Sequence, residues 1–212
     1  MTSPARLNSA AHPVRFRVRL SRPMNRTQVV IRLVLLCAIG MIGCSSVYWL
    51  LYLVLPAAAA LLISQHGPER YLAEDAPRIV HFLRWFAAAS AYLWLLTDQW
   101  PNHEQVSAVE VEIEAGGSPT ASSALLRLVY SVPALLLWAV LATASGLAWL
   151  VGAAVILVGG RIPAAIADWL AAMLRYQLRL LAYHLSLVDR YPSLEDAALA
   201  VDIPPADPGL TR

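Results

Sequence analysis

Lysine is absent from the 212-residue chain, so all 16 of its basic residues are arginines. Charged residues of both signs make up only 14% of the chain and hydrophobic residues 58%, whereas a soluble globular domain carries about a quarter charged residues. The apolar residues gather in two long stretches, residues 29–63 and 125–159, each with one arginine near its start. The core of a chain this size cannot bury stretches of that length, so they predict membrane segments.

Acidic residues are missing from the first 32 positions, which contain seven arginines. A basic segment directly before the first apolar stretch predicts a cytoplasmic N-terminus and an attraction to the headgroups of the lipid bilayer. The use of arginine alone, together with abundant alanine, indicates a G+C-rich bacterial genome. We therefore expect a multi-pass protein of the bacterial cytoplasmic membrane. Nucleic acid is not an expected partner, because no nucleic-acid-reading fold accompanies the charge.

Residues that could support catalysis are also scarce. The two cysteines, Cys37 and Cys44, lie seven apart in one apolar stretch; they are too few for a disulfide framework or a zinc site and are interpreted as packing thiols. No two of the five histidines have ligand spacing on one helix, and the chain has no glycine-rich phosphate loop and no serine elbow. We predict no catalytic residue, no cofactor and no metal, and hence no enzyme.

One stretch of the chain occurs twice, at residues 82–101 and 173–192. Such self-similarity predicts an internal duplication, with residues 13–103 as the first repeat and 104–195 as the second. The flanking residues 1–12 and 196–212 are predicted to be disordered. Aligned without a gap, the two copies share Leu83/Leu174, Arg84/Arg175, Ala91/Ala182, Tyr92/Tyr183, Leu96/Leu187, Asp98/Asp189 and Pro101/Pro192.

Each repeat opens with a strand signal. Residues 14–20 alternate apolar side chains with arginines, and residues 109–114 alternate them with glutamates. Because opposite charges facing one another stabilise a strand pair, we predict that the two strands pair outside the membrane. Two independent strands remain the alternative. The membrane-facing side of the pair would then consist of Val14, Phe16, Val18, Val109, Val111 and Ile113.

Each apolar stretch of about 35 residues would measure roughly 52 Å as one helix, against a hydrocarbon core about 30 Å thick. We therefore predict a tight transmembrane helical hairpin in each repeat, with breaks near Cys44-Ser45-Ser46 and Ser145-Gly146. A third helix completes the repeat. In the second copy, its polar residues share one stripe, which predicts an amphipathic helix lying in the interface. The alternative is that both third helices cross the membrane. Each repeat would then cross it three times, which gives six spans in place of four and places the two repeats in opposite orientations. The stripe consists of Asp168, Arg175, Arg179 and Ser186.

Ionisable residues inside apolar segments are candidate functional residues. Arg32 and Arg127 lie where an arginine can extend to the headgroups. Within each third helix an arginine precedes an aspartate by 14 positions, too far for contact within one helix. Across a pseudo-two-fold axis, Arg84 could meet Asp189 and Arg175 could meet Asp98. Alternatively, the aspartate and proline simply end the helix.

Several motifs around the repeated stretch carry a family resemblance. They are the opening strand, Arg127-Leu128-Val129 with Pro133, Gly160-Arg161-Ile162-Pro163, Leu174-Arg175-Tyr176, and Ala182-Tyr183 through Leu187-Val188-Asp189-Arg190-Tyr191-Pro192. Together they resemble a bacterial membrane family described as domain of unknown function 4389, in two tandem copies as in members associated with actinobacteria. The first copy departs from the pattern, because Gln65-His66-Gly67-Pro68 stands where a Gly-Arg-x-Pro turn is expected. The resemblance implies a multi-pass membrane protein but neither a reaction nor a ligand.

The sequence thus predicts a mainly α, integral membrane protein of two tandem repeats, each with a short strand, a transmembrane hairpin and an interfacial helix. The expected function is that of a non-enzymatic accessory or scaffolding component. Its expected partners are the lipid bilayer and a membrane protein or a second copy of the chain. The alternative is a small channel or transporter with an arginine- and aspartate-lined path between the repeats.

Overall fold

The computed structural model describes residues 12–20, 23–41, 44–101 and 108–192; apart from His12, the predicted disordered ends lie outside these residues. The described part is mainly helical, with one two-stranded antiparallel sheet, as predicted. Its elements follow in the order β1 (Val14–Val18), α1 (Arg26–Met41), α2 (Cys44–His66), α3 (Pro68–Arg70), the π-helical turn η1 (Tyr71–Asp75), α4 (Ala76–Leu93), β2 (Val109–Ile113), α5 (Ala121–Tyr130), α6 (Val132–Gly159) and α7 (Ala164–His184).

The predicted pairing of the two charged strands is confirmed. β1 and β2 run antiparallel, with Val14 opposite Ile113 and Arg15 opposite Glu112. A guanidinium nitrogen of Arg15 lies 3.6 Å from a carboxylate oxygen of Glu112 on the exposed face. Exposed pairs of this kind contribute about 1 kcal/mol or less, so burial of the opposite face supplies most of the stabilisation. All six predicted inward residues lie on that face, which packs against helices.

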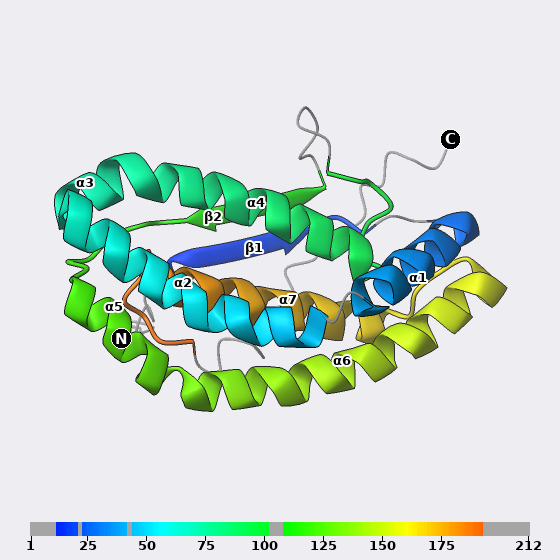
Figure 1. Ribbon diagram of the computed structural model, residues 1–212. Coiled ribbons are helices and arrows are strands. Elements are labelled where there is room, and N and C mark those ends of the chain that lie inside the picture. The colour runs from blue at the N-terminus through cyan, green and yellow to red at the C-terminus, as the bar shows by residue number, and fades with distance from the viewer. Residues whose placement is uncertain (1–11, 21–22, 42–43, 102–107, 193–212) are drawn as a thin grey trace, which may run out of the picture.

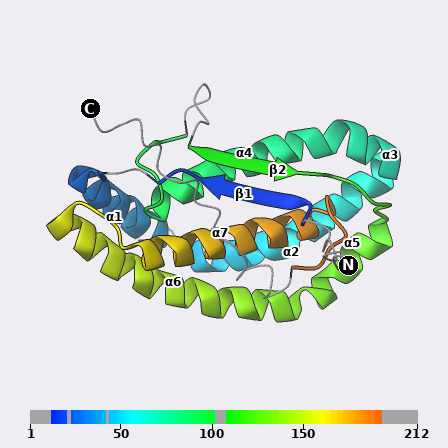
Figure 2. The same cartoon turned by 180° about the vertical axis from the view of Figure 1, so that it is seen from behind.

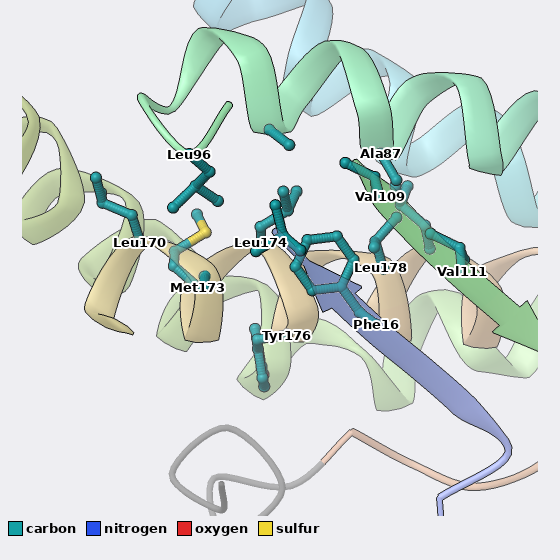
Figure 3. Close-up of a cluster of buried hydrophobic side chains, with 14 of the residues drawn as sticks. Phe16, Ala87, Leu96, Val109, Val111, Leu170, Met173, Leu174, Tyr176 and Leu178 are labelled. Carbon is teal, nitrogen blue, oxygen red and sulfur yellow. The ribbon is translucent and has the colours of Figure 1, made fainter. Parts of the chain in front are cut away.

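The buried face of the sheet packs against two helices that also contact one another. In Figures 1 and 2, α4 runs along one side of the strands and α7 along the other, and α6 follows the far side of α7. α7 is therefore the central element, in contact with the sheet, α4 and α6. Figure 3 shows the side chains that fill the space between these layers. Phe16, Val109 and Val111 extend from the strands toward Leu174 and Leu178 of α7.

The predicted hairpin in the second apolar stretch is wrong. α6 continues without interruption through Ser145 and Gly146 over 28 residues, because one glycine inside a helix costs only about 1 kcal/mol. The helical path breaks earlier, at Ser131, where Pro133 in the first turn of α6 lacks the N–H needed to continue α5. α5 and α6 then follow one another as a single arc (Figure 1). In the first apolar stretch, α1 ends at Met41 and α2 begins at Cys44, next to the predicted break, and α2 leads away from α1 at an angle instead of folding back along it (Figure 1).

The prediction of an interfacial third helix is wrong for α7. Every residue from Met173 to His184 is buried inside the protein, including Arg175 and Arg179 of the predicted polar stripe. α4, its counterpart, keeps an exposed face on which the rings of Phe82 and Trp85 stack, with centroids 6.1 Å apart. Between Met173 and His184 the helix is covered on all sides and has no face left for the bilayer, so Arg175 and Arg179 lie in the protein interior.

Large exposed apolar side chains cover the outer sides of α1, α2, α5 and α6. Within the described residues, α6 is the one helix both long and apolar enough to cross a membrane. Its 28 residues measure about 42 Å at 1.5 Å per residue. Its exposed positions recur at helical spacing along one side, which is the signature of a single apolar stripe. The stripe includes Leu136, Val140, Leu147, Val151 and Val158.

Candidate functional site

The first of two arginine clusters is built on Arg32, which α1 places in its second turn. The side chain is fully buried. Its Nη2 donates to the carbonyl oxygen of Thr97 and to Oδ1 of Asp98, both at 2.7 Å. Its Cζ lies 4.4 Å from the ring centroid of Tyr92, within the range of a cation–π interaction. The guanidinium is thus held by a carboxylate, a carbonyl and an aromatic face.

Asp98 also organises the start of α1. Its Oδ2 accepts a hydrogen bond from the backbone N–H of Asn25 at 2.8 Å. The side-chain oxygen of Asn25 in turn accepts from the backbone N–H of Thr27 at 2.9 Å, the arrangement that favours asparagine directly before a helix. A carboxylate near a helix N-terminus is also favourable electrostatically. One side chain therefore ties the beginning of α1 to the segment that follows α4.

The second cluster is built on Arg127 in α5. Its Nη1 donates to the carbonyl oxygens of Tyr183 at 2.8 Å and Val188 at 2.6 Å, and its Nη2 to Oδ1 of Asp189 at 2.5 Å. Its Cζ lies 4.6 Å from the ring centroid of Tyr183. Arg127 is almost fully buried, whereas the side chain of Asp189 is 56% exposed. Water therefore screens this ion pair more than the pair of Arg32 and Asp98.

The same backbone turn precedes the aspartate in both clusters. Each helix is followed by a residue with positive φ, 61° at Leu95 and 53° at Ser186. This is the Schellman helix ending, in which glycine is usual because a side chain is strained there. In both turns the next N–H donates to the carbonyl five positions earlier at 3.0 Å, from Leu96 to Ala91 and from Leu187 to Ala182.

Gly117 allows the second aspartate to approach the chain after β2. Its φ is 98°, and a Cβ added there would lie 2.0 Å from Oδ2 of Asp189. The neighbouring Gly116 donates its N–H to the carbonyl of Leu187 at 3.0 Å. A larger residue at position 117 would displace the carboxylate from Arg127, so the two glycines are part of the second cluster.

A buried tyrosine and a buried histidine connect the two halves near the second cluster. The hydroxyl of Tyr71, in η1, donates to the carbonyl of Leu185, and burial raises the pKa of Tyr71 to about 12. The fully buried His184 packs edge-on against Tyr52, with ring centroids 5.4 Å apart. Burial, followed by the nearby charge of Arg127, lowers the pKa of His184 to about 4, so the imidazole is neutral at pH 7.

The structure brings together four of the six candidate residues, in a different pairing from the one expected. Asp98 pairs with Arg32 and Asp189 with Arg127, so neither arginine extends to headgroups. Arg84 instead donates from Nε to the carbonyl of Val111 at 3.1 Å and ties α4 to the sheet. Arg175 is buried in the middle of α7. The aspartates do not end their helices, because α4 ends at Leu93 and α7 at His184.

The tyrosines of the two clusters were aligned with one another in the repeated stretch, but sequence reasoning gave them no role. Tyr92 and Tyr183 lie 91 residues apart, as do the two aspartates, whereas Arg32 and Arg127 lie 95 apart. The repeated stretches at residues 82–101 and 173–192 do not include these two arginines, so the ungapped alignment does not relate them. The signal that could have found the correspondence is the single arginine near the start of each apolar stretch.

Chemically, the two clusters are suited to holding helices together. Both guanidinium groups are engaged by carboxylates and carbonyls, and among the described residues no group of three histidine, cysteine, aspartate or glutamate side chains could hold a metal ion. The fold and these clusters define a mainly helical protein with at least one helix able to cross a membrane.

The segment that carries the second cluster matches a known family. Residues 121–194, from the start of α5 to beyond Asp189, match the family described as Domain of unknown function (DUF4389), which confirms the predicted resemblance for this part of the chain. No curated protein and no solved structure matches the chain.

Proposed function

We propose that the chain is a non-enzymatic membrane protein whose outer helices lie in lipid while its sheet faces water, where it serves as an accessory or scaffolding component. The observation that carries this proposal is the apolar stripe along α6, continued by exposed apolar side chains on α1, α2 and α5. Exposed apolar surface of that extent marks a membrane or protein interaction site. The two-stranded sheet presents the opposite character, with Arg15, Arg17, Glu110 and Glu112 exposed.

The position of the sheet favours helices that lie along the bilayer over helices that cross it. The strands run beside α7, and α7 packs against α6 (Figure 2). If α6 crossed the bilayer along its axis, the exposed arginines of β1 would enter the hydrocarbon, at about 2.5–3.5 kcal/mol each. With α6 in the interface, the apolar stripe enters the lipid and the charged strand face stays in water. The arginines before α1 favour the cytoplasmic leaflet of a bacterial membrane.

The two arginine clusters support descent of both halves from one unit. An arginine, a tyrosine and an aspartate meet in the same way in each cluster, and the turn before each aspartate has the same hydrogen bond. The aromatic residue two positions after each aspartate also packs edge-on against the cluster tyrosine, Trp100 at 5.1 Å and Tyr191 at 5.5 Å between centroids. In each half the cluster joins one helix to the segment that follows another helix. Such fixed contacts in both halves suit a rigid scaffold.

The contacts give less support to the channel alternative. Two of the four residues proposed to line a path, Asp98 and Asp189, are engaged by Arg32 and Arg127 instead. Large apolar side chains such as Leu174 and Leu178 fill the space between the sheet and α7. A path lined by arginine and aspartate would require these side chains to move. The scaffold therefore remains the preferred proposal.

Cysteine labelling tests how the protein lies in the membrane. With Cys37 and Cys44 replaced, the single variants Ser118→Cys and Arg161→Cys place one thiol before α5 and one after α6, both at exposed positions. We expect a membrane-impermeant maleimide to label both thiols from the same side of sealed vesicles. Labelling from opposite sides would show that the α5–α6 arc spans, and would overturn the proposed orientation. As a control, Val140→Cys is expected to react only after detergent is added.

The scaffold role is tested by purification in a mild detergent with light scattering. A scaffold is expected to elute with a partner or as several copies of the 23.1-kDa chain. The sheet face is the expected contact, so replacing Glu110 and Glu112 by glutamine should release the partner, while each exposed pair that is lost should cost the fold only about 1 kcal/mol or less. A protein that elutes as an isolated single chain before any substitution contradicts this role.

A further inference from the structure

A cavity of about 650 Å³ lies between α1, α4, α6 and α7. Its volume falls within the range of about 300–1,000 Å³ that is usual for small-molecule sites. Its walls are mostly apolar and include three indole rings, Trp94 at the end of α4 and Trp138 and Trp149 of α6. No residue that lines it carries a full charge at pH 7, so among the described residues nothing in it would hold an anionic or cationic group.

The cavity borders the apolar outer surface of the protein. Leu33 of α1 and Leu147 and Leu150 of α6 line it and are also exposed, at 45%, 64% and 57%. Leu147 belongs to the stripe that we propose faces lipid. A ligand would therefore enter from the hydrocarbon and not from water.

The polar atoms around the cavity further restrict what it can hold. The indole N–H of Trp149 already donates to the carbonyl of Leu93 at 2.8 Å, and the hydroxyl of Thr143 donates to the carbonyl of Ala139 at 2.9 Å. Both donors are thus satisfied without a ligand. Neither of these two donors needs an occupant as its partner, and the lining as a whole is mostly apolar, which suits a hydrocarbon chain.

We propose that this cavity binds one acyl chain of a membrane phospholipid, whose headgroup stays at the bilayer surface. The proposal rests on the proposed function, because lipid supplies the ligand only if the outer helices lie in the bilayer. Three observations carry it: the cavity's size, its mostly apolar and uncharged lining, and its continuity with the exposed stripe of α6. The bound chain would fill a space between the two halves and hold α1 against α6.

Two glycines of α6 provide matched variants. Gly146 lines the cavity, and a Cβ added there meets no atom within 4 Å, so Gly146→Phe would fill the cavity. Gly159 lies on the same helix with the same free space but outside the cavity, so Gly159→Phe controls for the loss of a helical glycine. Gly146→Leu serves as a second, smaller filling variant in case the phenylalanine prevents folding.

The test reconstitutes each full chain in phosphatidylcholine vesicles, extracts it into a phosphorus-free detergent and measures bound phosphate and bound fatty acid per chain. The unchanged chain and Gly159→Phe are expected to retain phospholipid equally. In Gly146→Phe, displacement of about two methylene groups should weaken retention by roughly tenfold. Equal retention in all variants would overturn the proposal, and so would retention of free fatty acid without phosphate.

Flotation of the same vesicles separates this proposal from the one it rests on. All variants are expected to float with the vesicles, because the outer stripe is unchanged. If they float but none retains phospholipid, the cavity proposal alone is lost. If the unchanged chain does not float, the membrane proposal is lost, and the cavity proposal with it.

Discussion

The ion pair between Arg32 and Asp98 predicts a large loss of stability in Asp98→Asn. The substitution keeps the shape of the side chain but removes the charge that compensates a guanidinium with no exposed surface, beside a carboxylate that is 19% exposed. It also places an amide donor against either Arg32 or the N–H of Asn25. Breaking a buried pair in this way costs about 3–5 kcal/mol. Because Asp98 keeps some water contact, we expect about 3 kcal/mol.

The matched control is Glu112→Gln on the sheet. Glu112 also faces an arginine, at 3.6 Å, but both side chains are at least half exposed, so this change should cost about 1 kcal/mol or less. For a chain of this size, about 3 kcal/mol corresponds to a fall in Tm of about 6–12 °C. Thermal unfolding followed by tryptophan fluorescence, in one detergent at pH 7, measures both. Equal shifts in the two variants would refute the reasoning that burial makes the Asp98 pair important.

Two further predictions concern the second cluster. Gly117→Ala should destabilise the protein by about 1–3 kcal/mol, because the new Cβ meets Asp189 and adopts a strained φ; in the same denaturation assay Gly116→Ala, whose Cβ meets no atom within 4 Å, should cost less. Burial lowers the pKa of His184 to about 4 in the folded protein, against 6.5 in the unfolded chain. The neutral imidazole therefore contributes about 3 kcal/mol to the free energy of unfolding above pH 6.5, and this contribution is lost as the pH falls toward 4. Urea unfolding at several pH values measures this loss, which should be smaller by about that amount in His184→Leu, where only the carboxylates still respond to acid; an equal loss in the two proteins contradicts the assignment.

The strand pair could be predicted because its signal is local and complementary. Alternation of apolar and charged residues places one face inward in each strand, and the opposite charges of Arg15 and Glu112 indicate the partner. The hairpin could not be predicted, because Ser145 and Gly146 are compatible with both a turn and a helix interior. Only packing distinguishes these possibilities: the hydroxyl of buried Ser145 accepts a hydrogen bond from the indole N–H of Trp169 at 2.9 Å.

The candidate residues were partly predictable, but their contacts were not. An arginine inside an apolar stretch is equally compatible with extension to headgroups and with burial against a carboxylate. Asp98 lies 66 positions from Arg32, and no pattern within one helix relates residues so distant. The interfacial position predicted for α7 was wrong for a similar reason. Periodicity shows that polar residues share one side of a helix, but it does not show what covers that side.

The antiparallel sheet also has a consequence for biosynthesis. Val14 pairs with Ile113, so β1 leaves the ribosome long before its partner strand exists. At about 5–20 residues per second, the intervening chain takes roughly 5–20 s to synthesise. During that interval the apolar face of β1 has no sheet partner, although α1, α2 and α4 have already been synthesised. The first half therefore cannot complete its sheet until β2 of the second half has been synthesised. A nascent chain truncated before β2 should be prone to aggregation and to degradation.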